Sequence, residues 1–302
     1  MKNRLILGGC LEVLPTIMPR SVDLVFGSPP YEDARTYGID FNLKGQEWVD
    51  WMVEVYRACL LRSKGLVAFV VQGRTRKFKW SCTPALLIAD LHRAGFNVRN
   101  PAIFQKFGIP GSGGPDWLRS DYEWIVCVSQ PGRLVWSDNT ACGHPPKWGP
   151  GGEMSHRQSN GTRRNKWGKS QSHLTSKHGA RKKDGSREYS GRPGDDEPIR
   201  LDSVPPDYVP PVKANPGNVL SIPVGGGIMG NRLCHENEAP FPEKLAEFFI
   251  KSFCPPGGTV LDPFLGSGTT AAVAKKNGRH YIGIDVRQSQ IELAEKRLGE
   301  IA

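Results

Sequence analysis

Short runs of apolar residues alternate along the chain with segments in which apolar residues recur every three to four positions. The continuous runs predict buried parallel strands, and the helical spacing predicts amphipathic helices. Strands are expected at residues 3–7, 22–26, 65–71, 259–262 and 280–285, and helices at residues 48–61, 242–253, after residue 268 and at 288–298. This alternation of strands and helices is typical of an α/β fold with a doubly wound, mostly parallel sheet.

A stretch of very different composition separates two groups of these elements. Residues 147–192 contain twelve Lys and Arg against three acidic residues, a net charge of +9 compared with +10 for the whole chain. The same stretch has one Leu and no Ile, Val or Phe, so it lacks the apolar surface for a core of its own. We therefore expect an irregular insertion at residues 137–215, between the two halves of one domain at 1–136 and 216–302.

The insertion can be interpreted as a solvated linker or as a nucleic-acid surface. Trp148, Trp167 and Tyr189 are spaced among its basic residues. Lys and Arg bind backbone phosphates, and aromatic rings stack on unpaired bases, so this composition favours nucleic acid. The candidate DNA contacts are Lys147, Arg157, Arg163, Arg164, Lys166, Trp167, Lys169, Arg181, Lys182 and Lys183.

The rest of the composition narrows the class of protein. No apolar run approaches the length of a membrane span, and the first 20 residues do not read as a secretory signal, so we expect a cytoplasmic protein. The seven cysteines are scattered, odd in number and without a Cys-x-x-Cys pair. They predict reduced thiols rather than disulfides or a zinc site.

A loop predicted to bind a cofactor runs from Asp262 to Thr270, between a strand and a helix. Gly266 and Gly268 let the backbone approach a ligand, and the amino terminus of the following helix offers free N–H groups. No lysine follows the second glycine, which argues against a phosphate-binding P-loop. Asp285 ends the next predicted strand, where it can accept hydrogen bonds from ribose hydroxyls or cap the following helix.

A second loop, Ser28-Pro29-Pro30-Tyr31, directly follows the strand predicted at residues 22–26. The prolines remove two N–H donors and stiffen the turn, which leaves carbonyl oxygens and the serine hydroxyl as acceptors beside an aromatic ring. Acceptors next to a stacking plane suit a flat base that carries an amine. A plain proline turn with a packed tyrosine is the alternative interpretation.

Together, and in this order, the two loops resemble the motifs of the class β DNA amino-methyltransferases. In that family (Asp/Asn/Ser)-Pro-Pro-(Tyr/Phe/Trp) is the catalytic motif, and Asp-Pro-Phe-x-Gly-Ser-Gly-Thr-Thr is the cofactor motif. The segment 235–253 is similar to the family's helix motif, which helps to hold the methionine end of the cofactor. The resemblance implies a Rossmann-like methyltransferase fold, S-adenosylmethionine as cofactor, and the insertion as the target-recognition region. It assigns catalysis to Ser28, Pro29, Pro30 and Tyr31, and cofactor binding to Phe241, Pro242, Asp262, Pro263, Phe264, Gly266, Ser267, Gly268, Thr269, Thr270 and Asp285.

The motif order separates this chain from other methyltransferases. The protein-glutamine enzymes and many RNA amino-methyltransferases carry the Pro-Pro-Tyr motif after the cofactor loop, whereas here it comes before. Methylation of carbon five of cytosine needs a cysteine nucleophile, typically after a proline, and no cysteine here follows one. One departure concerns the first strand, which ends in Gly8-Gly9-Cys10 where many relatives have Gly-Asp-Cys. That puts the usual adenine contact at this corner in doubt.

The resemblance also implies a mechanism and a substrate. Ser28 and a proline carbonyl would draw on the N–H groups of an exocyclic amine, Tyr31 would stack on a base extruded from the duplex, and the methyl group would transfer directly without a metal. Serine at the first motif position favours N(4) of cytosine over N(6) of adenine. The adenine enzyme remains the nearest alternative, followed by a non-catalytic DNA-binding protein and an RNA methyltransferase. The sequence leaves open a homodimer, a cognate restriction endonuclease, and a bacterial, archaeal or phage source.

Overall fold

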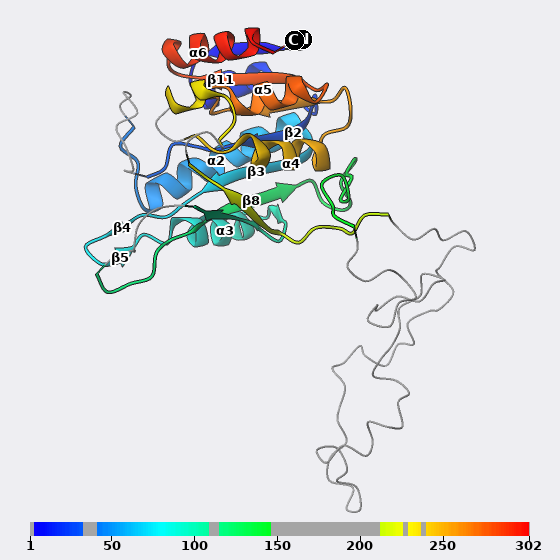
Figure 1. The fold of residues 1–302 in the computed structure, drawn as a ribbon. Coiled ribbons are helices and arrows are strands. Elements are labelled where there is room, and N and C mark those ends of the chain that lie inside the picture. Colours follow the sequence, from blue (N-terminus) through cyan, green and yellow to red (C-terminus); the bar gives the residue numbers. More distant parts are fainter. Residues whose placement is uncertain are drawn as a thin grey trace, which may run out of the picture. The chain divides into compact units, whose positions relative to one another are not determined.

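The computed structural model describes residues 3–32, 41–108, 115–145, 212–225, 229–236 and 240–301. A nine-stranded sheet forms the centre of this part of the chain, with helices on both of its faces (Figure 1). The strands follow the order β1 (Arg4–Leu7), β11 (His280–Asp285), β10 (Thr259–Asp262), β2 (Val22–Gly27), β3 (Ser63–Val71), β8 (Tyr122–Ser129), β7 (Ala102–Phe107) and β9 (Val219–Pro223), and β6 (Asn97–Val98) also pairs with β8.

The predicted single sheet is confirmed, because strands from both ends of the chain lie side by side. β10 pairs in parallel with β2, and β1 pairs in parallel with β11. Each predicted strand is present with ends within two residues of the expected position. Within the nine-stranded sheet, β8 runs opposite to the other strands, as its antiparallel pairs with β3, β6 and β7 show.

The helices likewise lie close to the predicted ranges. The expected helices are α2 (Gln46–Arg62), α4 (Glu243–Phe253), α5 (Thr269–Lys276) and α6 (Gln288–Gly299), and the pattern missed α1 (Cys10–Val13) and α3 (Thr83–Arg93). Pro242 is the N-cap of α4 and lies just before its first turn.

Strand β3 packs against helices on both faces of the sheet. Val67, Phe69 and Val71 belong to the core cluster that contains buried residues of α2 and α3. Leu66, Ala68 and Val70 belong to the opposite cluster, with residues of α4 and α5. Because side chains alternate across a strand, an unbroken apolar run indicates a strand that is covered on both faces.

Eight strands of the sheet point their carboxyl ends to one edge, which we call the carboxyl edge. β1, β2, β3, β10 and β11 run in parallel, and β6, β7 and β9 run the same way because β6 and β7 are antiparallel to the reversed β8 and β9 is parallel to β7. In sheets of this kind ligands bind outside the carboxyl ends of the strands. The loops that follow Leu7, Gly27, Asp262 and Asp285 all begin at this edge.

The chain divides into two compact units, Met1–Cys142 with Pro216–Ala302, and Gly143–Asn215. The first unit contains the sheet and its helices. All ten predicted DNA contacts belong to the second unit and lie outside the described residues, so the insertion's role in DNA binding stays a prediction. In the described part of the chain, no helix combines the length and apolarity needed to cross a membrane.

Candidate active site

A cavity of about 580 Å³ opens at the carboxyl edge of the sheet, and both predicted loops line it. All four residues of Ser28–Tyr31 face it from one side, and Pro263, Phe264 and Gly266 face it from the glycine loop. Asp285 lines the same cavity. The size falls within the range of small-molecule sites, which is roughly 300–1,000 Å³.

The loops meet because their strands are neighbours. Val260 and Leu261 of β10 pair with Leu24 and Val25 of β2. At the strand ends the backbone of Gly27 and the side chain of Asp262 come so close that a Cβ on Gly27 would lie 2.2 Å from Asp262 Oδ1. Position 27 must therefore be glycine, because any side chain there would collide with Asp262 where the two loops meet.

The serine-proline loop is held by contacts from two neighbouring elements and by a contact within the loop. Trp48 Nε1 of α2 donates to the Pro30 carbonyl at 2.9 Å. Ser28 Oγ lies 3.3 Å from both the Val70 carbonyl of β3 and the Tyr31 hydroxyl. These contacts fix the turn, and the carbonyl of Pro30 already has a protein donor.

A pair of charged residues that the sequence analysis missed supports Tyr31. Its hydroxyl donates to Glu123 Oε2 of β8 at 2.9 Å, and Glu123 Oε1 accepts from Lys106 Nζ of β7 at 2.7 Å. Both charged side chains are mostly buried. Hydrogen bonds thus run continuously from Ser28 through Tyr31 to Glu123. Because Ser28 and Glu123 are 95 positions apart in the sequence, no local pattern predicts this connection.

The glycine loop is held by acceptors at the ends of β10 and β11. Asp262 Oδ1 accepts from the Phe264 N–H at 3.0 Å, and Asp285 Oδ2 accepts from the Gly266 N–H at 2.9 Å. The N-cap of α6 is Arg287 rather than Asp285, whose Oδ1 accepts from the Arg287 N–H. The N-cap interpretation of Asp285 is therefore wrong, and its role toward a ribose stays a prediction.

The remaining residues predicted for cofactor binding do not line the cavity. Phe241 packs edge-on against Phe26 with ring centroids 5.6 Å apart, and Gly268 adopts φ = 76° close against Ala294, which leaves no room for a side chain. Four further members of the loop are buried beneath it, namely Asp262, Ser267, Thr269 and Thr270, and Pro242 caps α4. In this structure these residues lie outside the lining of the cavity, and those that belong to the glycine motif are packed behind it.

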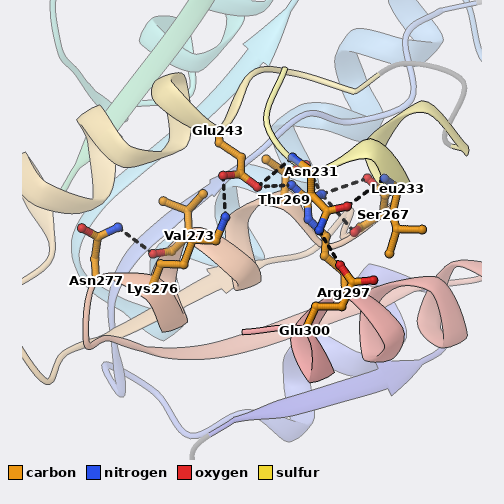
Figure 2. Close-up of polar contacts among 10 residues, drawn as sticks. All are labelled: Asn231, Leu233, Glu243, Ser267, Thr269, Val273, Lys276, Asn277, Arg297 and Glu300. Carbon is orange, nitrogen blue, oxygen red and sulfur yellow. Dashed lines mark hydrogen bonds and ion pairs between the residues drawn. The ribbon is translucent and has the colours of Figure 1, made fainter. Parts of the chain in front are cut away.

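Arg297 of α6 reaches this buried layer and holds it (Figure 2). Its guanidinium is fully buried and donates to Thr269 Oγ1 at 2.9 Å and to the Ser267 carbonyl at 3.2 Å. Its other end pairs with Glu243 of α4 at 2.6 Å, and Glu243 also binds Lys276 of α5 at 2.7 Å. Burial raises the pKa of Glu243, but the hydrogen bonds from Lys276 and Arg297 outweigh this effect, so the pKa is lowered.

Burial has the opposite net effect on Asp262. It raises the pKa of this carboxyl to about 7, although the nearby Thr270 hydroxyl and the hydrogen bond from the Phe264 N–H act to lower it, and the charge of Asp285 raises it further. Burying a charged carboxylate costs free energy, and a buried carboxyl usually avoids this cost by binding a proton.

The corner formed by Gly8-Gly9-Cys10 also faces the cavity, together with Glu12 of α1. A Cβ on Gly9 would lie 3.2 Å from Glu12 Oε2, so the glutamate carboxylate stands beside the position where many relatives carry an aspartate. The missing aspartate was the signal that could have directed attention to Glu12. Burial raises the pKa of the Cys10 thiol to about 12, which leaves it protonated and unsuited to act as a nucleophile.

A doubly wound α/β sheet, a glycine loop after one strand and an acidic residue after the next define a Rossmann-like protein that binds a nucleoside cofactor. The model of the DNA methylase family, which covers N(6)- and N(4)-methyltransferases, matches residues 22–296. The chain therefore belongs to this family of S-adenosylmethionine-dependent DNA amino-methyltransferases, and the predicted resemblance is confirmed.

Known relatives agree with this assignment. The orphan methyltransferase M.BamHII of Bacillus amyloliquefaciens is 28% identical over 92% of this chain and 89% of its own length. The type II methyltransferase M.HinfI of Haemophilus influenzae is 26% identical over 99% of this chain and 69% of its own. Among solved structures, the cytosine-N4-specific PvuII DNA methyltransferase covers 98% of this chain and 86% of its own, with a TM-score of 0.64 at 18% identity, and so shares the fold.

The cavity suits S-adenosylmethionine. Apolar and aromatic walls from Leu43, Trp51 and Phe264 fit a purine, and the carboxylates of Glu12 and Asp285 fit hydroxyl and amino donors. A putative DNA modification methylase from Thermus thermophilus, solved in complex with S-adenosyl-L-methionine, shares the fold with a TM-score of 0.55 over 99% of this chain and 94% of its own at 22% identity.

Proposed function

We propose that this chain methylates N(4) of cytosine in DNA, on a base extruded from the duplex into the cavity at the carboxyl edge. The observation that carries the proposal is that the serine-proline loop and the glycine loop line one cavity. Cytosine is favoured by the serine at the first position of the catalytic motif, and the PvuII enzyme that shares the fold is cytosine-N4-specific.

The chain's residues divide the chemistry between them. The exocyclic amine is a weak nucleophile because its lone pair is delocalised into the ring. Hydrogen-bond acceptors that draw on its N–H groups localise the lone pair on the nitrogen and make it more nucleophilic. Ser28 Oγ and the Pro29 carbonyl serve as these acceptors, since Trp48 already occupies the Pro30 carbonyl. The Tyr31 ring stacks on the base, and positioning is the main contribution to the rate. The cofactor, when bound, supplies an electrophilic methyl group on its sulfonium.

Methylation leaves one proton to be removed from the amine nitrogen, and the hydrogen bonds from Ser28 to Glu123 provide a route. The nitrogen gives its proton to Ser28 Oγ as Ser28 passes its own to Tyr31 and Tyr31 passes its own to Glu123. The carboxylate becomes neutral and Lys106 keeps its charge. One N–H bond breaks and one O–H bond forms, so the step is balanced.

Product analysis tests the proposal directly. The protein is incubated with labelled S-adenosylmethionine and unmethylated bacterial chromosomal DNA, the DNA is digested, and the labelled nucleoside is identified. We expect N(4)-methylcytosine, and N(6)-methyladenine would establish the adenine alternative. DNA binding without incorporation would indicate a non-catalytic protein, and preferential labelling of competing RNA would indicate an RNA enzyme. Methylation-aware sequencing after expression in a host would report the recognition sequence.

Substitution of Ser28 tests the catalytic assignment within this activity. Ser28→Ala removes one acceptor for the amine and is expected to lower kcat at least about 100-fold, a typical loss for a group that acts in the transition state. Cofactor binding, measured by calorimetry, should stay unchanged because Ser28 lies on the opposite loop. Gly266→Val is the contrasting variant, expected to abolish both cofactor binding and transfer. Normal turnover in Ser28→Ala would contradict the role assigned to this residue.

Three finer expectations accompany the proposal. The insertion at 137–215 is assigned to target recognition, so deletion of residues 147–192 should spare the fold and weaken DNA binding. We expect the protein in the cytoplasm of its host, where its proposed DNA substrate lies. A homodimer and a cognate restriction endonuclease remain open, to be tested by the mass of the protein in solution and by restriction of unmodified DNA.

A further inference from the structure

A short basic hairpin projects beyond the carboxyl end of β3 (Figure 1). It consists of β4 (Thr75–Arg76) and β5 (Lys79–Trp80). Four of the seven residues 74–80 are basic and none is acidic. At its tip Phe78 is 78% exposed, so its ring is open to a binding partner.

The turn that carries Phe78 has an unfavourable backbone conformation. Arg76 pairs with Lys79, so the turn has two residues, Lys77 and Phe78, and their φ angles are 46° and 63°. Two-residue hairpin turns that need positive φ normally use Asn and Gly, because a bulky side chain is disfavoured there. Outliers of this kind cluster at functional sites, and here the outlier presents a phenylalanine to solvent.

The base of the hairpin is joined to the catalytic loop. Glu32, the residue after Tyr31, is buried, and its carboxylate accepts from Thr83 Oγ1 and from the Gly45 N–H, both at 2.9 Å. It also accepts from the Arg74 N–H at 3.4 Å, where the hairpin begins. One buried carboxylate therefore connects the loop that binds the target base with the element that carries Phe78.

Two further exposed apolar side chains lie in a segment that is hydrogen-bonded to the base of the hairpin. Trp117 and Leu118 are 79% and 82% exposed in the connection between β7 and β8. Gln72, at the base of the hairpin, donates from Nε2 to Ser120 Oγ and to the Tyr122 carbonyl, both at 2.8 Å. Aromatic rings interleaved with Lys and Arg at the edge that holds the catalytic loop match the chemistry of a nucleic-acid duplex.

We propose that the β4–β5 hairpin is a second DNA-binding element, which enters a groove of the duplex beside the extruded base. Its lysines and arginines contact backbone phosphates, and Phe78 packs against the bases next to the gap that extrusion leaves. A two-stranded ribbon fits the major groove, and apolar wedges that fill disrupted base steps are known in DNA-binding proteins. The inference rests on the proposed function, and it assigns DNA contacts to the domain that holds the active site, in addition to the insertion.

Two sets of variants test the hairpin. Phe78→Ala is expected to lower kcat/KM for the duplex about tenfold or more, as for loss of an aromatic contact to a base, whereas Phe78→Trp should retain most of the activity. The double variant Lys77→Ala/Lys79→Ala should reduce the slope of log Kd against log salt by about 2, because each phosphate contact contributes roughly 0.9. The probe is a 30-base-pair duplex with the site that sequencing identifies, and binding is followed by fluorescence anisotropy.

Matched controls lie away from the carboxyl edge. Met18 is 67% exposed just before β2, at the opposite edge, and Lys296 is exposed on α6. Met18→Ala and Lys296→Ala should leave DNA binding, salt slope and transfer unchanged, and cofactor affinity should be unchanged in every variant.

Each outcome decides one question. Wild-type transfer and Kd in Phe78→Ala, or an unchanged salt slope in the lysine double variant, would overturn the inference, and equal losses in Phe78→Ala and Phe78→Trp would overturn the base contact. If the wild-type protein bound DNA without methylating it, the proposed function would fail, while the salt dependence of binding to a 30-base-pair duplex of arbitrary sequence would still test the hairpin.

Discussion

The two loops that line the cavity are held in different ways. The glycine loop rests on a layer of charged and polar groups that includes the buried Asp262 and Arg297 and the partly buried Glu243. The serine-proline loop is held at its rim, where Trp48 binds the Pro30 carbonyl and Glu123 binds the Tyr31 hydroxyl. In the first loop many motif residues build the support and few face the cavity, whereas in the second every motif residue faces it.

Because of this difference, substitutions at the two loops should affect cofactor binding and the rate of methyl transfer separately. Changes in the buried layer should displace the backbone that receives the cofactor, and they also expose uncompensated charge, so stability and cofactor affinity fall together. Changes at the rim of the serine-proline loop leave that layer intact and should lower the rate of transfer alone. Variants of the two loops can therefore be sorted by whether stability changes with activity.

The largest effect is expected for Arg297→Met. The change removes the donors to Ser267 and Thr269 and leaves Glu243 with Lys276 as its remaining partner. Breaking a buried ion pair on one side typically costs about 3–5 kcal/mol, and we expect about 3 kcal/mol here because Lys276 remains. Urea unfolding measures the loss, and calorimetry should show weaker cofactor binding. Lys296→Met, an exposed neighbour, is the control, and equal stability of the two variants would contradict the anchoring role of Arg297.

The parts of the fold that followed from the sequence are those with local signals. The buried parallel strands are unbroken apolar runs such as Val67–Val71, and the glycine loop carries its turn chemistry in consecutive residues. The reversed β8 and its partner β7 were missed. In β7 the polar residues Gln105 and Lys106 interrupt the apolar pattern. β8 does carry an unbroken apolar run, Trp124–Val128, but its reversed direction follows from its pairing with β3 and β7, which no local pattern records.

The same reason limits prediction of the site. Ser28 and Tyr31 were found because the motif is contiguous, whereas Glu123 contacts Tyr31 across 92 positions and Glu32 reaches Thr83 across 51. A sequence motif also does not distinguish a residue that contacts a ligand from one that supports the loop. Burial and hydrogen-bond partners make that distinction, and in this structure they place Thr269 in the support.

A moderate effect is expected from the pH dependence of Asp262. Its pKa is about 7 in the folded protein against 3.8 as the reference value, so the folded state holds a proton that the unfolded chain has lost. This contribution to stability is fully present below about pH 4, falls as the pH rises and is gone above about pH 7, with a slope of at most about 1.4 kcal/mol per pH unit. Asp262→Asn does not titrate, so its unfolding free energy should rise relative to the wild type between pH 5 and pH 8. Parallel pH curves for the two proteins would show that Asp262 is ionised in both states.

The smallest effect is expected for Tyr31→Phe, which separates the ring from its hydroxyl. The ring still stacks on the base, and Glu123 keeps its ion pair with Lys106 at 2.7 Å, so stability and cofactor binding should not change. Loss of one hydrogen bond to a charged group is worth about 1.5–3 kcal/mol at most, so kcat should fall by about tenfold, and Tyr31→Ala should abolish transfer. Tyr122→Phe, a partly exposed tyrosine on the same strand as Glu123, is the control for loss of a hydroxyl. A wild-type rate for Tyr31→Phe would remove Glu123 from the route of the proton, because no hydroxyl would then connect it to Ser28, and the rim of the loop would act through the shape of the ring alone.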